Sequence, residues 1–296
     1  MKKAWRKFVF LLVIAIGGPL MFSAFLYADP GPDKIVQSGV ILTVAESKRL
    51  IGKAVAQMPV VKNALENGIV IIIKGTTNAY VAEEITGKKS DHAAFVTGRV
   101  EPEKGTKYLP NVKPINHLVL EKGKVLDIPL PEAAKKLKAG DVVIKGANAL
   151  DYKNKTAATN ILDPVGGTLG ATWPISIARK VNVIIPVGLD KLVAGDVVDL
   201  TLKMREPMET LPPPAGKSPS AFPGYNIPSM WLLTGEIVTE LEAIKILTGA
   251  TAFQSSGGGV SGAEGAVWIV FRGTPEQVKK AQDLTRSILG EPAYTE

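Results

Sequence analysis

The chain has 296 residues, no cysteine and a formal net charge of +7, so disulfides and thiolate chemistry are excluded. Four of the 35 Lys and Arg residues lie before residue 28, which leaves 31 basic against 28 acidic side chains, a net charge of +3. This small excess, without basic runs interleaved with aromatics, indicates no nucleic-acid partner. With only His92 and His117 present, we expect no metal site and no cofactor, and we interpret each His as a surface or structural residue.

The first 28 residues have the pattern of a targeting segment. Basic residues precede an uncharged stretch of 20 residues, Phe8 to Tyr27, and Ala28 offers a small residue for cleavage. The pattern predicts a signal peptide or, because such a stretch is just long enough to cross a bilayer, an uncleaved N-terminal membrane anchor. In both cases we expect an extracytoplasmic protein, secreted or periplasmic, that meets the membrane only through this segment.

A capping-box pattern begins the first element after this segment. Thr43 to Glu46 predicts a helix that is bent or divided at Pro59 and ends at Gly68. The continuous apolar run at 69–73 predicts a short strand that is buried on both faces, and residues 78–85 follow it as a helix.

Strands and helices continue to alternate along the next part of the chain. The patterns predict a hairpin at 117–128, a helix at 131–141, a strand at 141–144, a helix at 166–180 and a strand at 183–187. "VAGDVV" at 193–198 is interpreted as a turn that leads into a strand. The alternation predicts an α/β fold in residues 29–209, with a mainly parallel sheet covered by helices on both faces.

The composition changes at residues 210–228, where six prolines indicate a linker. Beyond it, the patterns predict a strand at 233–238, a helix at 240–247, a Gly-rich turn at 257–265, a strand at 266–273 and a helix at 275–289. We expect residues 229–296 to form a small α+β subdomain of plait type that docks on the larger domain.

Three loops of small residues follow strands: "KGTTNAYVAEE" (74–84), "KGANALD" (145–151) and "DPVGGTLGATWP" (163–174). Ligands bind beyond the carboxyl ends of the strands in an open parallel sheet, so these loops predict a site at one sheet edge. The candidate ligand-binding residues are Lys74, Gly75, Thr76, Thr77, Asn78, Lys145, Gly146, Asn148, Asp151, Gly166, Gly167 and Thr168. Hydroxyls and helix N–H groups there can hold an anion, and the alternative is an ordinary turn with Thr as helix cap.

The order of these loops over residues 60–200 resembles the ribose-5-phosphate isomerase A and CoA-transferase superfamily. In that family a strand, a Gly-Ser/Thr phosphate loop and a helix read much like "KGTTNAYVAEEI". A later strand runs into an Asp-Gly-Ala-Asp-Glu segment, which "IKGANALD" resembles in place, and a Gly-rich segment then opens a helix, as "DPVGGTLGATWPISIARK" does. The resemblance implies a phosphate-binding loop at Lys74 to Asn78.

The residues that carry the family's chemistry are not retained. Lys145 and Asn148 stand where the isomerase pattern has its two aspartates. Aldose–ketose isomerisation needs a base and an acid around an enediolate, and Asn is no base at neutral pH, so we do not expect this activity. Glu83 and Glu84 fall on a helix outside the site, so neither fits the acyl-accepting carboxylate of the CoA-transferase branch.

Three functional classes fit these patterns. The first, which we expect, is a non-catalytic extracytoplasmic domain that binds a small anionic or polar ligand at the three loops. The second is an enzyme with Asp151 or Asp163 as base and Lys145 as electrophile, although lone Asp residues beside loops are usually caps. The third is a structural or assembly protein, compatible with an oligomer, that acts through residues 229–296 and the Pro-rich segment.

Overall fold

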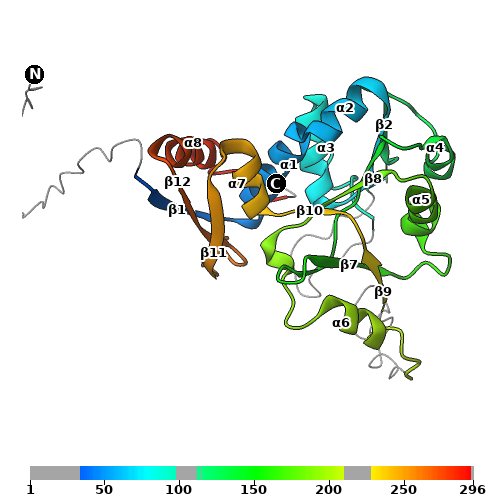
Figure 1. Cartoon of the computed structure of the whole chain (residues 1–296). Helices are drawn as coiled ribbons and strands as arrows, with labels where there is room; N and C mark the ends of the chain where they lie inside the picture. The colour runs from blue at the N-terminus through cyan, green and yellow to red at the C-terminus, as the bar shows by residue number, and fades with distance from the viewer. Residues whose placement is uncertain (1–33, 98–111, 114, 210–227, 295–296) are drawn as a thin grey trace, which may run out of the picture.

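The computed structural model describes residues 34–97, 112–113, 115–209 and 228–294. The targeting segment expected at 1–28 and almost all of the linker expected at 210–228 lie outside these residues. Within the described ranges, no helix has the length and apolar character needed to cross a membrane. Helices and mixed sheets alternate along the chain around a six-stranded, mostly parallel sheet, so the α/β fold is confirmed (Figure 1).

The central sheet has the strand order β10-β8-β5-β2-β3-β4. Its parallel strands are β2 (Ile69–Ile72), β5 (Val142–Ile144), β8 (Asn182–Pro186) and β10 (Glu236–Val238). The hairpin β3 (Leu118–Glu121) and β4 (Lys124–Val125) extends it antiparallel to β2. Parallel strands are buried on both faces and therefore appear as continuous apolar runs, which is why the patterns predicted β2, β5 and β8.

Alternate residues of β2 enter two separate hydrophobic cores. Val70 and Ile72 pack with side chains of α1 (Val44–Gln57), α2 (Pro59–Asn67) and α3 (Thr76–Thr86). Ile69 and Ile71 pack instead with side chains of α4 (Leu130–Lys136) and α5 (Gly167–Ala178). The capping box at Thr43 is present, and Pro59 divides the first helical stretch in two, as expected.

Two smaller antiparallel sheets complete the fold. One contains β1 (Val36–Leu42), β12 (Val267–Gly273) and β11 (Thr251–Gly257), with α7 (Glu240–Thr248) and α8 (Pro275–Arg286) packed near it (Figure 1). The other contains β6 (Ala149–Asp151), β7 (Thr156–Ile161) and β9 (Ser229–Leu233). Residues 229–296 therefore contribute strands to all three sheets, and β1 from the start of the described chain pairs with β12.

Two local predictions are wrong. The strand expected after "VAGDVV" is the helix α6 (Val197–Lys203), because the Asp196 side chain accepts hydrogen bonds from the N–H groups of Val198 and Asp199 and caps a helix there. The single strand expected at 233–238 is divided between β9 and β10. Gly235 lies between them, and a Cβ at this residue would stand 2.6 Å from the Val183 carbonyl oxygen.

Candidate functional site

Two lysines and a histidine meet at the carboxyl edge of the central sheet. Ile72 of β2 pairs with Ile144 of the parallel neighbour β5, so Lys74 and Lys145 follow the ends of adjacent strands. Ile72 also pairs with Leu118 of the antiparallel β3, which places His117 beside the same edge. We call Lys74, Asn78, His117, Lys145 and Thr159 the edge site.

His117 is held in its neutral form. The backbone N–H of Lys74 donates to His117 Nδ1 at 3.0 Å, so the ring proton of the neutral tautomer lies on Nε2. Burial, and to a smaller extent the charges of Lys74 and Lys145, lower the pKa of His117 to about 4. At neutral pH His117 therefore supplies a hydrogen-bond donor without a positive charge.

Lys145 is a largely enclosed amine whose hydrogen-bond partners among the described residues are neutral. Its Nζ donates to the Gly146 carbonyl at 3.2 Å and to Thr159 Oγ1 at 3.4 Å, and Thr159 in turn donates to Asn148 Oδ1 at 2.7 Å. Burial lowers the pKa of Lys145 to about 8. No ion pair between described residues involves Lys145 or Lys74, and burial also lowers the pKa of Lys74.

Asn78 ties the two strand ends together. Its Nδ2 donates to the carbonyls of Ile73 at 2.7 Å and Ile144 at 3.2 Å, one from each strand end. The side chain is fully buried, and its Oδ1 accepts no hydrogen bond from the described residues. A Cβ on Gly146 would stand 3.8 Å from this oxygen. Asn78 thus fixes the backbone that carries Lys74 and Lys145 and leaves one acceptor unused.

The helix that begins at the edge site has no side-chain cap. Gly75 is the N-cap residue of α3, the first turn contains no acidic residue, and a Cβ on Gly75 would meet no heavy atom within 4 Å. By contrast, Thr or Asp side chains cap four other helices, at Thr43, Asp196, Thr239 and Thr274. The first N–H groups of α3, at Thr76 and Thr77, therefore have no side-chain cap, and an anion bound beside Lys74 can accept from them.

The two candidate aspartates act as caps. The Asp151 carboxylate accepts from the Asn154 backbone N–H at 3.0 Å, a bond that holds the pKa of Asp151 below its usual range. The Asp163 carboxylate accepts from the N–H groups of Val165 at 2.9 Å and Gly167 at 3.0 Å. Both carboxylates are thus engaged in local turns, and neither hydrogen-bonds to a residue of the edge site.

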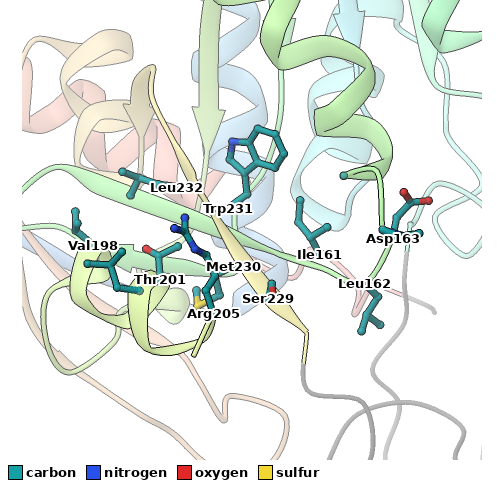
Figure 2. A pocket seen from close by; sticks show the side chains of 13 residues that line it. Ile161, Leu162, Asp163, Val198, Thr201, Arg205, Ser229, Met230, Trp231 and Leu232 are labelled. Atoms are coloured by element: carbon teal, nitrogen blue, oxygen red, sulfur yellow. The ribbon is translucent and has the colours of Figure 1, made fainter. Parts of the chain in front are cut away.

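Gly166 lines a cavity of about 610 Å³ between β9, α6 and the loop before α5, and no edge-site residue lines it (Figure 2). A Cβ on Gly166 would stand 2.9 Å from the Trp231 ring, and Gly167 and Thr168 follow in the first turn of α5. The lining is mainly apolar, with Arg205 and Thr201 contributed by α6 and the loop after it. The third loop therefore does not join Lys74 and Lys145 in one hydrogen-bonded group.

Two edge-site residues were missed by the sequence patterns. His117 was interpreted as surface or structural, although its place as the first residue of the hairpin predicted at 117–128 was a usable signal. Thr159 lies on β7, which was not predicted because its sequence TAATNI is small and polar rather than apolar. Among the described residues, no group of three His, Asp or Glu side chains is arranged to hold a metal ion.

Comparison of the chain with protein-family models, curated proteins and solved structures finds no match. The function is therefore argued from the chemistry of the edge site.

Proposed function

We propose that the protein binds a small anionic ligand at the edge site. The observation that carries this proposal is the enclosed Lys145 ammonium, which has two neutral acceptors and no carboxylate among the described residues. A buried cation without a counter-charge costs free energy, and Lys74 beside it adds a second one. An anionic ligand would neutralise this charge and relieve the cost, and the relief would contribute to the free energy of binding.

The neutral donors support the same ligand class. His117 Nε2 and the first N–H groups of α3 can donate to an anion without adding positive charge that would repel the lysines. Because burial keeps His117 neutral down to a pH of about 4, this donor set persists through the ordinary range of pH.

We also propose that the chain is a distant relative of the ribose-5-phosphate isomerase A and CoA-transferase superfamily. The fold supports this proposal. The neighbouring order of β2, β5 and β8, with the Lys74 loop and α3 after β2, is the arrangement that the resemblance implies. The two cores against alternate residues of β2 support a sheet covered on both faces, and the β1-β12-β11 sheet with α7 and α8 supports a small plait-like unit. An extracytoplasmic location is proposed from the targeting segment alone.

The proposal is tested by thermal denaturation of the full chain with increasing inorganic phosphate and, separately, with pyruvate. We expect a rise in Tm with ligand concentration, because a ligand at 100 times its Kd stabilises the folded state by about 2.7 kcal/mol. The rise should disappear in Lys74→Ala and Lys145→Met. It should persist in Lys136→Ala, which removes a half-exposed lysine paired with Glu121. Equal shifts in all three variants, or no shift with either anion, would overturn the proposal.

A further inference from the structure

The surroundings of Lys145 suit a nucleophile as well as a binding cation. An amine attacks a carbonyl only in its neutral form, and two features of lysine sites favour that form: enclosure by protein and a second cation nearby. Lys145 has the first, because it is buried among neutral hydrogen-bond partners and its pKa is lowered by that burial, and Lys74 follows the adjacent strand end. A structural lysine would normally be paired with a carboxylate, which would hold the proton on Nζ.

The amine is also positioned and reachable. Gly146 O and Thr159 Oγ1 accept from Nζ, and Thr159 is oriented by its own hydrogen bond to Asn148. Lys145 as a residue retains some solvent exposure, as do Lys74 and Gly75. The space beside Gly75 is open.

We propose that Lys145 forms a reversible imine with the carbonyl carbon of a small oxo acid, whose carboxylate is bound by Lys74 and the first N–H groups of α3. This deepens the proposed function, since it names the substrate class of the same anion site. An oxo acid carries one group for each part of the site. Its carboxylate can accept from the fixed donors, and its carbonyl carbon is an electrophile for the amine.

The step balances without a further reactant. The neutral Lys145 amine gives its electron pair to the carbonyl carbon, and the oxygen takes up the proton that the nitrogen releases, which yields a carbinolamine. The nitrogen lone pair then expels the hydroxyl with a proton as water and leaves an iminium ion. From lysine ammonium and oxo acid, the products are therefore the iminium and one water. The substrate's own carboxylate supplies the negative charge that the iminium needs, since no carboxylate of the described residues pairs with Lys145.

The experiment is reductive trapping of the full chain. The protein is incubated with pyruvate, reduced with sodium borohydride, digested and examined by mass spectrometry. We expect an adduct with the mass of pyruvic acid less one oxygen atom on Lys145, after which trypsin no longer cleaves. Labelling should rise as the pH approaches about 8, where half of the Lys145 amines are neutral, and should fall when inorganic phosphate competes.

The variant Lys145→Arg separates imine formation from anion binding. It keeps a positive charge but cannot form an imine, so it should retain the Tm rise with phosphate and lose the adduct. Labelling of Lys145 no greater than that of the half-exposed Lys136 would overturn the imine. If that result came with the phosphate- and pyruvate-dependent Tm rise intact, the anion site would stand and only the covalent step would fall. Loss of both would remove the proposed function as well.

Discussion

Two regions of the molecule enclose a basic side chain in opposite ways. The Arg49 cluster, Arg49 with Glu83, Glu84 and Glu291, joins α1, α3 and the chain after α8. The guanidinium meets the three carboxylates at 2.6, 3.0 and 2.8 Å, and it lies 4.6 Å from the centre of the Tyr80 ring. At the edge site, the partners of Lys145 among the described residues are one carbonyl and one hydroxyl.

The pKa values show how the two surroundings differ. Burial by itself lowers the pKa of Arg49, but its hydrogen bonds to Glu291 and Glu83 outweigh burial and the net shift is upward. Burial acts on Lys145 without such compensation, and its pKa falls to about 8. A fully paired buried charge is a structural element, whereas an unpaired one is maintained at a cost to stability and is a candidate for function.

The largest expected effect is the loss of the paired cation. Arg49→Ala leaves three carboxylates without their partner, and we expect unfolding free energy to fall by about 3–5 kcal/mol, as when one partner of a buried ion pair is removed. Chemical denaturation measures the change. Arg286→Ala is the matched control, because that side chain is 77% exposed and its ion pair with Asp283 is long, at 3.9 Å. This substitution should change stability by less than about 1 kcal/mol. Equal losses in the two variants would break the comparison.

Replacing the unpaired cation, Lys145, should raise stability, whereas replacing Arg49 lowers it. The folded-state pKa of Lys145, about 8, lies below the ordinary 10.5, so the unfolded chain binds more protons between these values and stability rises with pH there. Below pH 8 the full penalty is present, and Lys145→Met should be more stable than the natural chain by on the order of 3 kcal/mol, at about 1.4 kcal/mol per pKa unit.

Paired denaturation curves of the natural chain and Lys145→Met across this pH range measure that difference. We expect it to shrink as the pH rises towards 10.5 and to vanish when phosphate occupies the site. A difference that does not vary with pH would contradict the assignment of a lowered pKa to Lys145.

Loss of the Asn78 hydrogen bonds that join the two strand ends should have a smaller effect on stability. Asn78→Ala removes the donor to two buried carbonyls, at Ile73 and Ile144, and should lower stability by about 1–3 kcal/mol while weakening phosphate binding. Asn67→Ala, which removes an exposed side chain bonded to Asn63, is the control and should be close to neutral. Unchanged phosphate affinity in Asn78→Ala would show that this residue does not position the lysines.

The smallest effect is expected at Thr159. Thr159→Val removes one acceptor from Lys145 and the donor to Asn148, so we expect a loss of about 1 kcal/mol and a further fall in the pKa of Lys145. Thr159→Ser keeps the hydroxyl and should restore both. Equal behaviour of the two variants, by denaturation and by titration of Lys145, would exclude a role for the hydroxyl.

The parts of the fold that the sequence predicted are those that depend on local pattern. The strands at 69–72 and 142–144 are continuous apolar runs because both of their faces are buried. Lys74 and Lys145 follow the ends of these two strands. α6 was mistaken for a strand because its β-branched start obscured the cap at Asp196.

The remainder of the site depends on pairing between distant segments. His117 enters the site through the register of β3 against β2, and Thr159 enters it through β7, whose small polar residues form a strand only because β6 and β9 pair with it. Burial and missing counter-charges arise from the same packing. They decide the chemistry of Lys145 and have no signature in the local sequence.

The most direct test of the central claim is the titration of Lys145 in the folded chain. Nitrogen-15 NMR of the lysine side chains, with the Lys145 signal assigned by its absence in Lys145→Arg, measures its pKa with and without inorganic phosphate. We predict a pKa of about 8 for the protein alone and a rise towards 10.5 when phosphate is bound. A pKa near 10.5 that phosphate leaves unchanged would contradict an unpaired cation kept for an anionic ligand.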